Sequence, residues 1–189
     1  MFSVPVLFIL PNRNLQSEEF NSMNISELSS EYEVRKLTED DVDIVYQLSL
    51  GNPMYFEYCP PAVPKESIIQ DMSALPPRTT KKQKYYVGYF KQNHLVAVAD
   101  LIVKYPNEQT VFVGFFMMAI EYQKKGIGSK LVKELEEFFR KNRYLYIRLG
   151  FVKGNPQSEA FWKKNGFIPT GIEVMQDRYT VVVMQKELK

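Results

Sequence analysis

A glycine-containing stretch between residues 121 and 131 gives the clearest indication of the fold, and it reads Glu121-Tyr122-Gln123-Lys124-Lys125-Gly126-Ile127-Gly128-Ser129-Lys130-Leu131. It follows an apolar run at residues 110–119, typical of a buried strand, and it opens a segment whose Leu131, Leu135 and Phe138 recur at helical spacing. Glycines allow the backbone to curl around an anion, and the free N–H groups at a helix N-terminus point toward it. The stretch therefore predicts a loop that binds phosphate or pyrophosphate.

Two familiar nucleotide-binding loops do not fit this stretch. A P-loop requires Gly-Lys followed by Ser or Thr, whereas Gly128 is followed by Ser129 and then Lys130. A dinucleotide-binding fingerprint requires a third Gly or Ala where this chain has Leu131. The expected anion therefore belongs to another class of ligand.

The rest of the chain predicts one mixed α/β (α+β) domain. Strands are expected at residues 32–37, 85–90, 95–104, 110–119 and 144–152 and in two runs after 168, with helices at 38–51, 64–75, 128–141 and 158–165. Successive antiparallel strands alternate with helical crossovers, which predicts a mixed, mostly antiparallel central sheet flanked by helices. Residues 1–30 are expected to form an N-terminal extension outside the functional domain, which spans residues 31–189.

Composition excludes several classes of function. The chain has 189 residues and a formal net charge of +2, too balanced for a protein that binds nucleic acid through its phosphate backbone. A single cysteine, Cys59, and a single histidine, His94, argue against disulfides and a metal site and favour a reducing, cytoplasmic location. The apolar run at residues 2–10 is too short to cross a bilayer, so no membrane partner is expected.

A second segment lies downstream of the loop and reads Gly154-Asn155-Pro156-Gln157-Ser158-Glu159-Ala160-Phe161-Trp162-Lys163-Lys164-Asn165-Gly166-Phe167. With the loop, it resembles the GNAT superfamily of N-acetyltransferases, which are acyl-CoA N-acyltransferases. The family's Gln/Arg-x-x-Gly-x-Gly/Ala loop is matched by Gln123, Gly126 and Gly128. The resemblance covers residue 32 to the C-terminus and implies a central sheet split by an acyl-CoA cleft.

The resemblance also implies where acetyl-CoA, or another short acyl-CoA, would bind. Backbone N–H groups of the loop would hold the pyrophosphate, and the main chain of residues 116–118 would pair with the pantetheine as an added strand. Gly114 marks either a bulge where the sheet splays or a close backbone contact within the core. The implied cofactor-binding residues are Phe116, Met117, Met118, Gln123, Lys124, Lys125, Gly126, Ile127, Gly128, Ser129, Lys130, Asn155, Ser158 and Trp162.

The catalytic groups are less clearly indicated. Trp162 occupies the position at which many family members carry a proton-donating Tyr, so Tyr122 is the candidate acid, with Tyr179 or water as alternatives. Asp100 lies inside an apolar run and is the candidate base, because a lone carboxylate on an apolar face is costly unless paired or functional. Its alternative is a structural Asp at a strand end or facing solvent that bonds a backbone amide.

The acceptor is expected to meet the Pro- and Tyr-rich stretch at residues 52–64, with Tyr55, Glu57 and Tyr58 forming the substrate pocket or packing beneath a loop. The favoured function is transfer of acetyl to the primary amine of a small molecule by direct attack. A catalytically silent acyl-CoA sensor and a protein or peptide N-acetyltransferase remain alternatives. The sequence permits a homodimer without fixing the oligomeric state.

Overall fold

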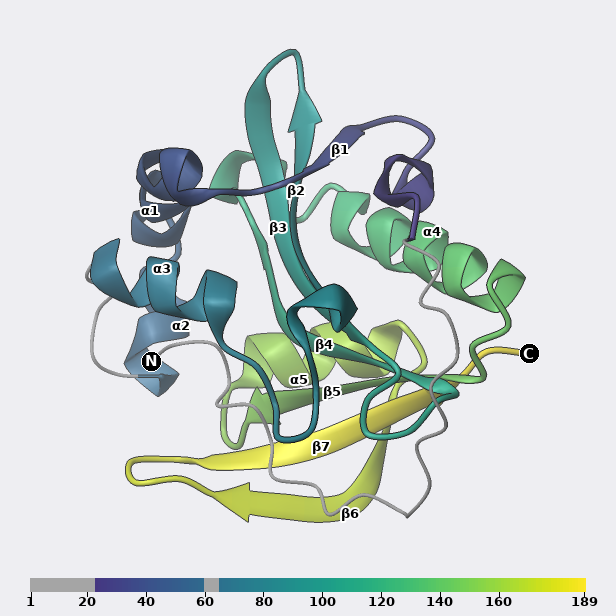
Figure 1. Ribbon diagram of the computed structural model, residues 1–189. Helices are drawn as coiled ribbons and strands as arrows, with labels where there is room; N and C mark the ends of the chain where they lie inside the picture. The colour runs from purple at the N-terminus through teal and green to yellow at the C-terminus, as the bar shows by residue number, and fades with distance from the viewer. Residues whose placement is uncertain (1–22, 60–64) are drawn as a thin grey trace.

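The structure is a computed structural model that describes residues 23–59 and 65–189. Seven strands form one sheet in the order β1-β2-β3-β4-β5-β7-β6, in which β4 and β5 are parallel and all other neighbours are antiparallel (Figure 1). The strands are β1 (Glu33–Lys36), β2 (Lys84–Lys91), β3 (His94–Val103), β4 (Thr110–Met118), β5 (Tyr146–Val152), β6 (Ile168–Met175) and β7 (Thr180–Glu187). The α-helices are α1 (Val42–Leu50), α2 (Pro53–Tyr58), α3 (Lys65–Ser73), α4 (Ile127–Lys141) and α5 (Pro156–Lys164). The predicted mixed, mostly antiparallel sheet is confirmed.

Local signals in the sequence account for the turns and helix starts. Gln92 and Asn93 adopt φ of 49° and 65° between β2 and β3, the left-handed conformation that a tight hairpin turn requires. A capping box forms at Thr38, whose backbone N–H donates to the Asp41 carboxylate at 2.9 Å just before α1.

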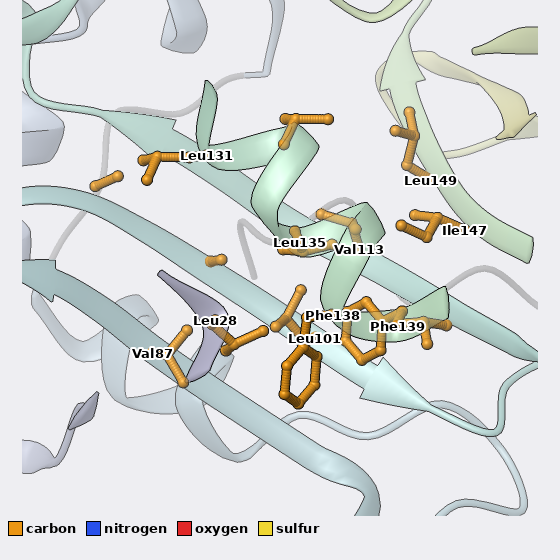
Figure 2. Close-up of a cluster of buried hydrophobic side chains, with 14 of the residues drawn as sticks. Leu28, Val87, Leu101, Val113, Leu131, Leu135, Phe138, Phe139, Ile147 and Leu149 are labelled. Carbon is orange, nitrogen blue, oxygen red and sulfur yellow. The ribbon is translucent and has the colours of Figure 1, made fainter. Parts of the chain in front are cut away.

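The two faces of the sheet carry different helices. Figure 1 shows α1, α2 and α3 on one side and α4 on the other. Figure 2 shows α4 presenting Leu131, Leu135, Phe138 and Phe139 to apolar side chains of the sheet, and all four are buried. The inward-facing residues predicted for this helix are therefore confirmed. On the opposite face, Val45 of α1 and other buried residues of α1 and α3 pack on the sheet.

Two parts of the structure differ from the sequence prediction. The stretch expected to be a loop at residues 52–64 contains α2, which begins with Pro53 at its first turn; residues 60–64, with the predicted helix start at Pro64, lie outside the described residues. Residues 23–30, assigned to an extension, pack on the domain instead. Leu28 is fully buried against the α4 side of the core, and Ser29 donates to Glu134 of α4 at 2.7 Å. Residues 1–22 lie outside the described residues.

The α4 interface should contribute much of the stability. Phe139 is fully buried, so we expect Phe139→Ala to lower the free energy of unfolding by about 3–5 kcal/mol, measured by urea denaturation. Lys133→Ala on the exposed face of the same helix is the control and should change it by less than about 0.5 kcal/mol. Equal effects of the two variants would contradict this packing.

Candidate active site

The central feature of the site is a parting of β4 from β5. Ladder pairing between these parallel strands runs from Thr110↔Tyr146 to Val113↔Leu149 and stops there, although both strands continue. A cleft opens beyond this point, lined by Tyr55, Val113, Gly114, Phe115, Phe116, Leu149, Gly150, Phe151, Val152, Asn155, Ser158 and Trp162.

A β-bulge lies at the start of the cleft. Asp100 of β3 is opposite Phe115 and Leu101 is opposite Val113, so Gly114 is the extra residue on β4. A Cβ atom on Gly114 would lie 2.7 Å from Oδ2 of Asp100. Both interpretations of Gly114 in the sequence, a bulge at the splay and a close contact in the core, are therefore confirmed.

The backbone of β4 beyond the bulge has a defined orientation. The Ala119 N–H donates to the Val96 carbonyl at 2.9 Å, so this pair forms the hydrogen-bonded type of antiparallel pair. Because such pairs alternate along an antiparallel ladder, the peptide groups of Met117 face β3, whereas those of Phe116 and Met118 face away from it. Of these two residues, Phe116 lines the cleft, whereas Met118 lies beyond its lining at the end of β4.

The glycine-containing loop stands at the N-terminus of α4. Gly126 has φ of 78° and precedes the first helical residue, Ile127, and a Cβ on Gly126 would meet no atom within 4 Å. Gly128 is buried in the first turn, where a Cβ would lie 2.7 Å from the Met118 sulfur and 3.2 Å from the Phe161 ring. Gly126 thus allows the turn, while Gly128 lets the helix approach the end of β4. Ser129 is half-buried in the same first turn.

Charges around the loop are arranged unevenly. Lys124 and Lys125 are exposed, and Lys124 has φ of 57°. Lys130 forms an ion pair with Glu31, and this partner lowers the pKa of the Glu31 carboxyl. A helix N-terminus with nearby lysines attracts anions, so the loop has the geometry and the charge of a phosphate site.

The side chain of Gln123 points back into the protein. Its Nε2 donates to Oδ1 of Asn52 at 2.6 Å and to the Met118 carbonyl at 3.0 Å. Asn52 Nδ2 donates to the same carbonyl at 3.0 Å. These contacts, here called the Asn52 clamp, join the residue before α2, the end of β4 and the loop. The sequence indicated Gln123 but not Asn52, because the contact spans 71 residues.

Aromatic rings line both sides of the cleft. Trp162 packs on Phe116 with ring centroids 5.9 Å apart, and Phe161 stacks on Phe116 at 6.0 Å. Tyr55 of α2 meets Phe115 edge to face at 5.8 Å. Among the described residues that line the cleft, Tyr55 has the one titratable side chain.

Asp100 lies behind the cleft lining rather than in it. Its side chain is fully buried, and both carboxylate oxygens accept hydrogen bonds of 2.8 Å from Nζ of the buried Lys84. Burial raises the pKa of the Asp100 carboxyl above its ordinary value, an effect that Lys84 partly offsets. The site is therefore neither a strand end nor solvent-facing, and the partner, Lys84, was not anticipated. The role of Asp100 as a base stays a prediction.

The candidate acids occupy different places. Tyr122 is partly buried in the turn after β4 and does not line the cleft. Tyr179 and Tyr55 both form hydrogen bonds with the Cys59 thiol, and burial raises the pKa of both tyrosines. Trp162, in contrast, lines the cleft at the position expected from the sequence.

Of the remaining predicted site residues, some line the cleft and others do not. Asn155 and Ser158 line the cleft, but Oδ1 of Asn155 accepts from the Ser158 backbone N–H at 3.0 Å and so also caps α5. Glu57 is exposed and Tyr58 half-buried on α2, and neither lines the cleft. Phe115 was missed, although it lies inside the strand predicted to line the cleft.

Residues 23–59 and 65–189 contain neither a metal-binding cluster nor a membrane-spanning helix. Among the described residues, no group of three or more His, Cys, Asp or Glu is arranged to hold a metal ion. No helix in this part of the chain is long and apolar enough to cross a membrane.

Comparison with known proteins places this architecture. The sequence profile of the acetyltransferase (GNAT) family matches residues 50–167, which is more than half of the chain. A search of curated protein sequences finds no match.

Solved structures share the fold at low identity. PaiA N-acetyltransferase from Thermoplasma acidophilum in complex with coenzyme A is 19% identical, with a TM-score of 0.60 over 82% of this chain and 98% of its own. An acetyltransferase from Salmonella typhimurium that modifies the N-terminal serine of a 50S ribosomal subunit protein is 19% identical, with a TM-score of 0.65 over 86% and 98%. Ribosomal-protein-alanine N-acetyltransferase from Brucella melitensis is 21% identical, with a TM-score of 0.57 over 82% and 99%.

The split sheet, the glycine loop at the start of α4 and the profile match over residues 50–167 agree. The chain belongs to the acetyltransferase (GNAT) family and is an N-acetyltransferase.

Proposed function

We propose that the protein transfers an acetyl group from acetyl-CoA to the primary amine of a small molecule by direct attack. The observation that carries this proposal is the parting of β4 from β5 beside the glycine loop of α4. The described residues fit acetyl-CoA, because one end of the cleft offers an anion site and its wall offers strand peptide groups that have no partner in the sheet.

Acetyl-CoA would bind along this cleft in two parts. The N–H groups of the first turn of α4 would hold its pyrophosphate, with Lys124 and Lys125 adding attraction. The peptide groups of Phe116, which face away from β3, would pair with the amides of pantetheine as a strand edge pairs with a peptide. Two further lining residues, Asn155 and Trp162, would border the same groove.

The acceptor would approach over Tyr55 and Phe115, which form an apolar wall with Val152. Such a wall suits an amine carried on an aromatic or aliphatic group. Desolvation disfavours the ammonium form and lowers its pKa, which increases the fraction of neutral amine. The amine therefore becomes nucleophilic as it enters the cleft.

The thioester of acetyl-CoA supplies an activated acetyl group. The amine nitrogen forms a bond to the carbonyl carbon, the carbon–sulfur bond breaks, and sulfur keeps the electron pair. The Met118 N–H faces away from β3 and would donate to the carbonyl oxygen as negative charge develops there. The proton lost by the amine goes to water, and water protonates the leaving sulfur. The candidate acid Tyr122 does not line the cleft, and the hydroxyl of Tyr55, which does, is hydrogen-bonded to Cys59 and has a raised pKa.

Acetyl-CoA should stabilise the protein against heat, whereas NAD should not. A ligand that binds only the native state, at a concentration of about 100 times its dissociation constant, raises the free energy of unfolding by about 2.7 kcal/mol. Ser129→Glu should abolish the shift in melting temperature, because it places a negative charge in the first turn of α4, where Glu does not destabilise the unliganded helix.

Ser129→Ala is the matched control, which removes the hydroxyl without adding charge and should retain the shift. Thermal unfolding of the three proteins with and without ligand measures both effects. A shift that survives in Ser129→Glu would place the pyrophosphate elsewhere, and a wild-type protein with no shift would refute the acetyl-CoA assignment.

The acceptor class can be tested by turnover. We expect 2-phenylethylamine and hexylamine to be acetylated with a higher kcat/KM than spermidine, an aminoglycoside or a peptide with a free N-terminus. Release of free thiol and mass spectrometry of the products measure this preference. Faster turnover of the peptide would favour a protein N-acetyltransferase, and binding of acetyl-CoA without turnover of any amine would favour an acyl-CoA sensor.

The Asn52 clamp should affect cofactor binding. Asn52→Ala removes the hydrogen bonds that hold the Met118 carbonyl and Gln123, so we expect acetyl-CoA affinity to fall about tenfold, measured by calorimetry. Asn142→Ala is the control, because the Asn142 side chain likewise donates a hydrogen bond to a backbone carbonyl, that of the residue four positions earlier. Asn142 lies at the C-terminal end of α4, far from the loop. Equal affinities in the two variants would show that the clamp does not position the loop.

A further inference from the structure

The Lys84–Asp100 pair is the buried charge pair nearest to the bulge. Asp100 has an exposed side-chain fraction of 0% and Lys84 of 5%. A buried ion pair is often no more stabilising than apolar residues of similar volume, because both charges lose their hydration. Stability alone therefore does not account for the Lys84–Asp100 pair, and its position in the fold indicates another role.

The pair stands directly on the bulge. Oδ2 of Asp100 lies 2.7 Å, and its Cγ 3.4 Å, from the point that a Cβ of Gly114 would occupy. The carboxylate thus fills the space above Gly114, the residue at which the β3–β4 register shifts. Lys84 holds both oxygens from β2, the next strand, so the carboxylate cannot swing away without losing two hydrogen bonds.

The bulge, the end of the β4–β5 ladder and the cleft coincide. Val113 forms the last pair with β5, Gly114 is the bulged residue, and Phe115 and Phe116 line the cleft. A bulge shifts the register by one residue, so it determines which peptide groups of β4 face away from β3. Whatever fixes the bulge also fixes the direction of the Phe116 and Met118 peptide groups.

We propose that Asp100, held by Lys84, is a positioning residue that keeps the β4 bulge at Gly114 and thereby presents the backbone of Phe116 and Met118 to acetyl-CoA. This role rests on the proposed binding of acetyl-CoA in the cleft. It is an alternative to the role of general base that the sequence suggested for Asp100, and it is supported by the place of the carboxylate behind the lining and by its two hydrogen bonds from Lys84.

The first test introduces a clash at the bulge. Gly114→Ala should raise the dissociation constant of acetyl-CoA by about tenfold or more, because the new methyl group and the Asp100 carboxylate cannot share one space. Gly88→Ala is the matched control: Gly88 lies in β2, and its Cβ would be equally crowded, 2.7 Å from the Phe90 ring, but it lies outside the cleft lining. It should lower the melting temperature and leave the dissociation constant unchanged.

The second test removes the carboxylate. In a background of Lys84→Met and Asp100→Ala, which also avoids an unpaired buried lysine, Gly114→Ala should change the dissociation constant by less than about threefold. Circular dichroism and the melting temperature establish that each variant is folded before calorimetry with acetyl-CoA. A simple stability role would give equal affinity losses in both backgrounds or none in either, and either result would overturn the proposal.

The third test separates positioning from acid–base catalysis. Asp100→Asn keeps the shape and an oxygen that accepts from Lys84, so its acetyl-CoA dissociation constant and kcat should stay within about threefold of wild type. A loss of kcat of about 100-fold or more with unchanged affinity would instead identify Asp100 as a base. Failure of the wild-type protein to bind acetyl-CoA would refute the proposed function itself, whereas binding with equal effects of Gly114→Ala and Gly88→Ala would refute the positioning role alone.

Discussion

Backbone pairing between β4 and β5 ends at Val113 and Leu149, and the placement of the ligand-facing groups depends on this interruption. Two parallel strands that remained paired would use the peptide groups of β4 for the ladder, leaving no free edge inside the sheet. On its other side, β5 stays paired with β7 as far as Val152. Strands β4 and β5 can therefore diverge while each remains part of the sheet. The sheet thus contains an internal edge, which an amide-bearing ligand can complete.

Some residues around this edge are required by packing and are also proposed to contact the ligand. Gly128 is required by the close approach of the Met118 sulfur and the Phe161 ring, quite apart from any phosphate. Asn155 both caps α5 and borders the cleft. Where a residue serves both purposes, loss of binding in a variant is informative only beside a control that shares the packing cost.

Short-range patterns in the sequence predicted most of the fold, although one local signal was not recognised. The loop before α4, the two strands that flank residues 92–93 and the helical segment that begins at Thr38 depend on neighbouring residues, and all were predicted. Helix α2 was missed even though Asn52-Pro53 carries a signal, since Pro is favoured at the first position of a helix.

The Lys84–Asp100 pair illustrates the limit more sharply. Counting outward from the Lys91↔His94 pair, an unbroken hairpin would place Asp100 opposite Tyr85, with Lys84 on the other face of the sheet. One extra residue, Val96, shifts the register so that Asp100 faces Tyr86, and Lys84 then lies on the same face. Such a bulge leaves little trace in the apolar run around it, so the pair follows only from the structure.

The contact between Ser29 and Glu134 joins residues 105 positions apart in the chain. During synthesis the segment carrying Leu28 leaves the ribosome long before α4 exists to receive it. Its apolar side chain must therefore wait, exposed, while most of the sheet is made. This long loop can close only once α4 has been made, while β5, α5, β6 and β7 are still to follow, so the N-terminal segment joins the core midway through synthesis rather than starting it.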